Sequence, residues 1–116
     1  MEKYSFVFKG RGASWNDIYG SNNWRTRKTV VDKYKTSFQW IIKEAKLPQF
    51  EEFEITVQYN SRHDVDNVGC MVKICADALK GIYVPDDSPK HFKKMSIEYD
   101  TTLEKNNFKF TITILK

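Results

Sequence analysis

The sequence predicts a single α+β domain over residues 1–116, in which two helices cover one face of a four-stranded mixed sheet. Two kinds of apolar periodicity indicate this architecture. Apolar residues alternate with polar ones along four short segments, 4–9, 53–59, 95–99 and 108–114. In two longer segments they recur every three or four residues, as on one face of a helix. A chain of 116 residues suffices for one two-layer core.

The first strand is indicated by Tyr4, Phe6 and Phe8, which alternate with smaller or polar residues. Residues 10–25 are rich in Gly, Ser and Asn, a composition typical of an ordered loop that carries aromatic side chains. Two interpretations of this loop remain open. Its aromatic residues cap one end of the core, or it contacts a nucleic-acid backbone, with phosphates bound by Arg11, Arg25 and Arg27.

The first helix is expected over residues 27–46, with Thr26 as its N-cap and Pro48 just past its end. Its core-facing residues are Val30, Val31, Tyr34, Phe38, Ile41, Ile42 and Ala45. The second helix should bury Val68, Met71, Val72, Cys75 and Leu79 and end near Gly81.

Two cysteines lie five residues apart in the second helix, Cys70 and Cys75. At 100° per residue their side chains diverge by about 140°, so they neither share a metal nor form a disulfide with each other. We expect both to be reduced core residues, as in a cytoplasmic protein.

Three strands follow the first helix in the predicted order. Residues 53–59 precede the second helix, and residues 95–99 and 108–114 follow it, joined by a polar segment that we expect to be a hairpin loop.

Composition excludes some partners and favours others. No apolar run reaches membrane-spanning length and the N-terminus lacks a signal-peptide pattern, so we expect a cytoplasmic protein with no membrane partner. The net charge of +4 favours a polyanionic partner, although charge alone is a weak indicator.

Two pairs of aspartates flank the second helix: Asp64 and Asp66 before it, Asp86 and Asp87 after it. If residues 64–66 are extended, the first two carboxylates lie on one side of the backbone, about 6.6 Å apart. At an effective dielectric constant near 20 they repel each other by about 2.5 kcal/mol. A cation would offset that repulsion, and hard carboxylate oxygens suit Mg²⁺ or Mn²⁺.

A structural interpretation accounts for each piece separately. Either Asp66 or Asn67 can cap the following helix, because acidic and amide side chains at a helix N-terminus accept hydrogen bonds from free backbone N–H groups. The segment Pro-Asp-Asp-Ser-Pro, residues 85–89, has an ordinary turn composition.

The combined pattern resembles the RusA-type Holliday junction resolvases, a family of small endonucleases of phages and bacteria. The resemblance rests on Asp-Val-Asp-Asn at 64–67, Asp-Ala-Leu-Lys-Gly at 77–81 and Asp-Asp-Ser at 86–88. It extends to Ser-Trp-Asn-Asp-Ile-Tyr at 14–19, and to the basic residue Arg62 ahead of the paired aspartates.

The resemblance implies a homodimeric, RusA-like nuclease with one metal site per subunit. On this chain the three acids correspond to Asp64, Asp66 and Asp87. The family's essential lysine falls at Cys70 here, and Lys73 is the natural substitute, because it precedes Asp77 by the spacing that the family keeps. We expect Asp77 to pair with Lys73 along the helix, and Asn67 to support the turn.

The resulting hypothesis is a Mg²⁺-dependent endonuclease that resolves four-way DNA junctions by paired cuts, as part of recombination and repair. Catalysis is assigned to Asp64, Asp66, Asp87 and Lys73, with DNA contacts from Arg62, Lys80 and Lys90 besides the arginines of the early loop. One alternative is a dimer of the same fold that binds branched DNA without cutting it. Another is an interaction protein whose aspartates only cap and turn.

Overall fold

The computed structural model of the chain describes residues 2–10, 12 and 24–116, with side chains of the first helix described from residue 28 onward. The expected aromatic loop therefore lies outside the described residues, as do Arg11 and the side chains of Arg25 and Arg27. The elements, in chain order, are β1 (Glu2–Lys9), α2 (Trp24–Ala45), β2 (Phe53–Asn60), the 3₁₀ helix η1 (Val65–Val68), α3 (Gly69–Leu79), β3 (Phe92–Tyr99) and β4 (Asn107–Ile114).

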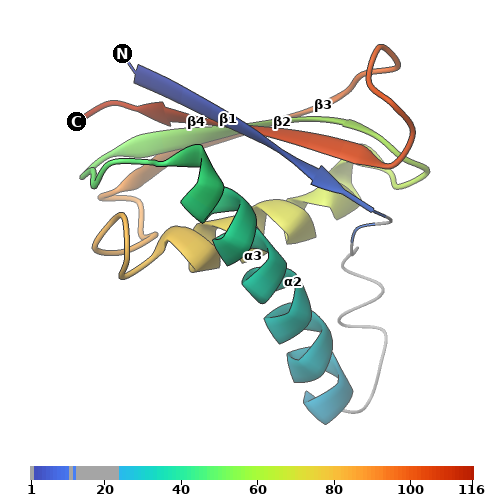
Figure 1. Cartoon of the computed structure of the whole chain (residues 1–116), viewed down its shortest axis with the longest axis horizontal. Helices are drawn as coiled ribbons and strands as arrows, with labels where there is room; N and C mark the ends of the chain where they lie inside the picture. The colour runs from blue at the N-terminus through green and yellow to red at the C-terminus, as the bar shows by residue number, and fades with distance from the viewer. Residues whose placement is uncertain (1, 11, 13–23) are drawn as a thin grey trace.

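The four strands form one mixed sheet in the order β1-β4-β2-β3 (Figure 1). β4 pairs antiparallel with both β1 and β2, whereas β3 pairs parallel with β2. The α+β class and the mixed four-stranded sheet are thus confirmed. The parallel pair requires a crossover, which η1 and α3 supply.

The expected hairpin between the last two strands is wrong. β3 and β4 are not neighbours, because β2 lies between them. The connecting segment instead crosses the end of β2, where the side-chain amide of Asn60 donates to the Leu103 carbonyl at 2.8 Å and the Asn60 carbonyl accepts from the Asn106 N–H. A polar segment between two alternating runs predicts a reversal of direction, but not which strands then pair.

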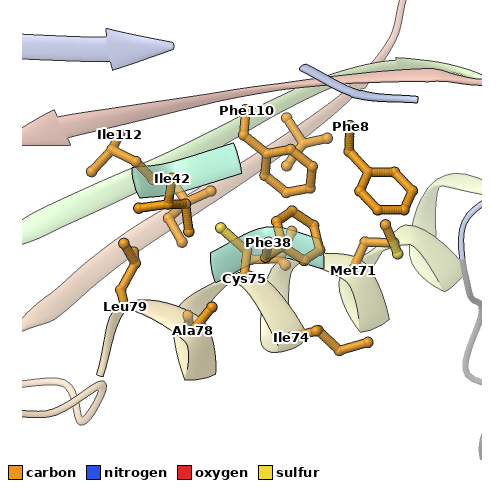
Figure 2. Close-up of a cluster of buried hydrophobic side chains, with 14 of the residues drawn as sticks. Phe8, Phe38, Ile42, Met71, Ile74, Cys75, Ala78, Leu79, Phe110 and Ile112 are labelled. Atoms are coloured by element: carbon orange, nitrogen blue, oxygen red, sulfur yellow. The ribbon is translucent and has the colours of Figure 1, made fainter. Parts of the chain in front are cut away.

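Both helices lie on the same face of the sheet (Figure 1). α2 packs against α3 and β1, and its N-terminal turns project beyond the sheet. Only two residues of its expected stripe, Phe38 and Ile42, are therefore fully buried, whereas the others are partly buried. Figure 2 shows these two side chains between residues of the sheet and residues of α3.

Packing around Phe38 is aromatic. Its ring lies 5.2 Å from that of Phe8 in a stacked arrangement and 5.0 Å from that of Phe110 edge-to-face, both distances between ring centroids. These rings join α2 to β1 and β4 and form the centre of the core.

α3 is buried on almost every side. Its buried residues are Gly69, Cys70, Met71, Val72, Ile74, Cys75, Ala76, Ala78 and Leu79. Both cysteines are free and buried, as expected, and burial raises the pKa of the Cys75 thiol. No helix in the described part of the chain is long and apolar enough to cross a membrane.

The element boundaries differ from expectation at two functionally relevant places. α2 begins at Trp24, so Thr26 lies inside the helix and is not its N-cap. The Asp64–Asp66 segment is not extended throughout. Asp64 has extended backbone angles and holds the N-cap position of η1, whereas Asp66 lies within that 3₁₀ helix. The two carboxylates therefore do not follow the alternation of a strand.

Replacing Phe38 by alanine should destabilise the fold by about 3–5 kcal/mol, because it removes a fully buried ring and leaves a cavity between both layers. The measurement is the free energy of unfolding in urea. Trp40→Ala, on the same helix but 66% exposed, is the matched control and should change stability little. An equal loss in both variants would contradict this account of the core.

Candidate functional site

α3 presents one polar stripe to solvent. Lys73, Asp77 and Lys80 follow each other at spacings of four and three, so they lie on one face of the helix, while the remaining residues of α3 are buried. Charged side chains on α3 can reach solvent only along this stripe, because the sheet and α2 pack against the rest of the helix. Asp86 and Asp87, which follow the helix in sequence, contact the lysines of this stripe.

Asp87 is bound by two lysines of the stripe. Its Oδ2 lies 3.3 Å from Lys73 Nζ and its Oδ1 lies 3.8 Å from Lys80 Nζ. Lys73 and Lys80 are about 10.5 Å apart along the helix axis. Because Asp87 contacts both lysines, the segment that follows α3 must run back alongside the helix. The side chain of Asp87 is 17% exposed, the lowest value among the acids in these ion pairs.

Each of the two lysines also has a second acidic partner. Lys73 Nζ donates to Asp77 Oδ1 at 3.0 Å, which confirms the expected pairing along the helix. Lys80 Nζ lies 3.3 Å from Asp86 Oδ1 and 3.8 Å from Asp87 Oδ1, so the two adjacent aspartates contact the same ammonium group. The cluster of Lys73, Lys80 and three aspartates is called the α3 charge cluster below.

The pKa values of two members of this cluster, Lys73 and Asp86, are shifted in the direction that favours the charged form. The hydrogen bond to Asp77 raises the pKa of Lys73, against a smaller opposing effect of burial. The pKa of Asp86 is lowered by the backbone N–H of Asp87 and then by Lys80. Since the lysine side chains are 56% and 51% exposed, they remain accessible to a ligand in solvent.

Asp64 and Asp66 lie at the other end of the crossover, before α3 begins. Both are exposed, and neither Asp64 at the N-cap position of η1 nor Val68 before α3 makes a side-chain capping hydrogen bond. The capping role considered for Asp66 and Asn67 is therefore wrong. Asn67 instead donates its backbone N–H to the Asp64 carbonyl at 3.0 Å.

Tyr59, the last buried residue of β2, links this segment to the sheet. Its hydroxyl donates to the His63 carbonyl at 2.8 Å. Burial raises the pKa of Tyr59, and the charges of Asp64 and Asp66 add to the effect, so both carboxylates lie near the end of β2.

Three expected metal ligands thus form two groups. Asp64 and Asp66 precede α3, whereas Asp87 follows it and forms ion pairs with Lys73 and Lys80. Among residues 2–10, 12 and 24–116, no group of three or more His, Cys, Asp or Glu side chains is arranged to hold a metal ion. The carboxylate donors suit a hard divalent ion chemically, but their arrangement in this structure does not gather three of them.

The other expected DNA contacts are exposed but dispersed. Arg62 follows the C-terminal end of β2 and Lys90 precedes the N-terminal end of β3. Because these strands are parallel, the two cations lie at opposite ends of the sheet. Lys80 was expected to contact DNA. Its pairing with Asp86 and Asp87 was missed, although its spacing of seven from Lys73 places both lysines on one helix face.

His91 makes a polar contact through its ring, and His63 makes a hydrogen bond through its backbone N–H. His91 Nδ1 lies 2.7 Å from the Glu51 carbonyl oxygen, and the His63 backbone N–H donates to Ser61 Oγ at 3.2 Å.

No protein-family model and no curated protein matches this chain. The functional interpretation therefore rests on the residues and their geometry.

Replacing Asp77 by asparagine should lower the pKa of Lys73, because the charged hydrogen bond that raises it most is lost. The ion pair stabilises the fold while Lys73 is protonated, and that contribution disappears as the pH rises through the raised pKa of Lys73. The measurement is an NMR titration of the Lys73 Cε resonance.

Asp86→Asn is the matched control, because Asp86 pairs with Lys80 and not with Lys73. An unchanged titration in Asp77→Asn, or an equal shift in both variants, would contradict the assigned hydrogen bond.

Proposed function

We propose that the protein is a Mg²⁺-dependent, structure-selective DNA endonuclease that cuts four-way or related branched junctions. The observation that carries the proposal is the α3 charge cluster. A carboxylate held between two solvent-accessible ammonium groups, on the single polar stripe of an otherwise buried helix, brings together the groups that phosphodiester hydrolysis uses. The resemblance to the RusA-type resolvases supports the same activity.

The proposed metal ligands are Asp64, Asp66 and Asp87, with Mg²⁺ or Mn²⁺ as the ion. When bound, the ion supplies Lewis-acid activation of the phosphate and a water of lowered pKa. Asp77 acts as a positioning residue, whose carboxylate accepts a hydrogen bond from the Lys73 ammonium group. The Lys73 ammonium is placed to stabilise negative charge on phosphate oxygens, and Lys80 lies on the same face.

DNA binding is proposed to use Lys80 of this cluster together with cations at both ends of the sheet. Arg62, Lys80 and Lys90 are exposed, and a net charge of +4 favours a polyanion. Because each phosphate contact releases counterions, the affinity should fall steeply with salt concentration. Two opposed cuts in a four-way junction require two sites, so a symmetric homodimer is part of the proposal. We place the protein in the cytoplasm, where recombining DNA is found in bacteria.

Asp66→Asn should reduce the cleavage rate of a synthetic four-way junction in Mg²⁺ by about a hundredfold, because an amide is a weaker ligand than a carboxylate for a hard cation. The measurement is single-turnover cleavage. Asp32→Asn, an exposed substitution of the same kind on α2, is the control and should cut at the wild-type rate.

Equal cleavage by the wild type and Asp66→Asn would reject the metal assignment. A chain that binds the junction but neither cuts it nor takes up Mg²⁺ in a calorimetric titration would support the non-catalytic DNA-binding dimer. The observation that favours this second candidate is that the described residues contain no group of three or more potential metal ligands.

Lys73→Ala should lower turnover by about a hundredfold while junction affinity changes little, because the ammonium acts on charge that develops during cleavage. Turnover and binding are measured separately, by single-turnover cleavage and by gel shift in Ca²⁺. Lys43→Ala, which removes an exposed lysine from α2, is the control. Unchanged turnover in Lys73→Ala would show that another cation stabilises the charge that develops during cleavage.

A further inference from the structure

β3 is the last strand in the sheet order. Among the described residues, β2 is the only strand that pairs with it, so its other side is an edge of this sheet. The Asp100 N–H donates to the Tyr59 carbonyl at 2.8 Å, so residues at even positions of β3 direct their backbone groups toward β2. By alternation, Met95, Ile97 and Tyr99 direct their N–H and C=O groups away from the sheet.

The side chains of these three residues form an apolar strip along the same edge. Met95, Ile97 and Tyr99 are in register with β2 residues that are 0–1% exposed and face the helices. Because paired residues of neighbouring strands point to the same face, the strip also lies on the helix-bearing face. Met95 is nevertheless 54% exposed and Tyr99 51% exposed, so the contact of β3 with η1 leaves much of this strip accessible to solvent.

The opposite face of β3 carries charges that complement each other under two-fold symmetry. In an antiparallel pairing of two β3 strands centred on Ser96, Lys94 of one copy lies directly opposite Glu98 of the other, and this occurs twice. The same register places Met95 opposite Ile97 of the second copy, with the outward N–H and C=O groups of both in hydrogen-bonding position. Within the described part of the chain, neither Lys94 nor Glu98 has an ion-pair partner.

Other registers lack this complementarity. Centring the pair on Met95 places Lys94 opposite Ser96. Centring it on Ile97 places Lys94 opposite Asp100, which lies past the end of the strand and whose carboxylate already accepts hydrogen bonds from Thr102. Lysines on edge strands ordinarily oppose association, because like charges meet. In the register centred on Ser96, each Lys94 instead lies opposite a Glu98 of the other copy, so both contacts are attractive.

We infer that β3 is the interface through which two copies of this chain associate, by antiparallel β3–β3 pairing with the two-fold axis at Ser96. The two four-stranded sheets then continue as one sheet of eight strands, with all helices on one face. The apolar strips of the two copies meet along the axis and cover each other. The two α3 charge clusters consequently open on the same side of the assembly. The interface does not depend on the proposed nuclease activity and needs neither DNA nor metal.

The test is the solution mass of the chain and its charge-reversal variants, by sedimentation velocity over a concentration series. The wild type should sediment at twice 13.7 kDa. Glu98→Lys alone, or Lys94→Glu alone, places like charges directly opposite each other and should raise the dimer dissociation constant about tenfold or more.

Mixing these two single variants should restore a dimer, because a carboxylate then lies opposite an ammonium group at both of the symmetry-related contacts. The doubly exchanged variant Lys94→Glu with Glu98→Lys should dimerise as the wild type does. Glu44→Lys, an exposed charge reversal on α2, is the control and should remain dimeric.

A second variant tests the backbone pairing independently of charge. Met95→Pro removes an outward N–H that makes no bond to β2, so it should leave the fold intact by circular dichroism while giving a monomer. A monomeric wild type would overturn the proposal, as would single charge reversals that dimerise like the wild type, or mixed variants that do not recover the dimer.

Discussion

The burial of α3 is the constraint on which the rest of this structure depends. The helix lies against the sheet and against α2, and nine of its eleven residues are buried. Charged side chains can project into solvent from only one face of such a helix. Lys73 and Asp77 occupy that direction within the helix, and Lys80 continues it immediately after. The polar chemistry of the domain is concentrated there because the apolar packing of the core leaves no other surface of α3 exposed.

The crossover topology explains why the acids separate into two groups. β2 and β3 are parallel, so the chain must travel the length of the sheet between them, and an α3 of eleven residues covers about 16 Å of that distance. Asp64 and Asp66 belong to the start of this path and Asp87 to its end. The doubling back of residues 80–87 brings Asp87 part of the way, to a point between Lys73 and Lys80. The two lysines neutralise its charge in this conformation, which relieves the repulsion that a gathered set of carboxylates would create.

Local patterns in the sequence predicted most elements, and non-local pairing accounts for most errors. Alternation located the strands, and the spacing of four between Lys73 and Asp77 gave their ion pair, because both features depend only on backbone geometry. The false hairpin between β3 and β4 arose because a polar loop specifies a reversal but not the insertion of β2. The extended form expected for residues 64–66 failed because β2 ends at Asn60 and the chain turns into η1, which buries Val68 under the sheet. The N-cap role expected for Asp66 or Asn67 failed for the same reason, because both residues lie within η1, which precedes α3.

The position of Lys73, the lysine proposed to act in catalysis, follows from the same packing. In the family that the sequence resembles, the lysine corresponds to position 70, where this chain has cysteine. Cys70 is 0% exposed, so a lysine at that position would place an ammonium group in the core, at a large cost in desolvation. Position 73 is the first on α3 whose side chain reaches solvent, and it is also the position from which an ammonium contacts both Asp77 and Asp87. Given how this helix is buried, a lysine that acts at the surface of α3 belongs at position 73, so the departure from the family pattern is compatible with the proposed activity.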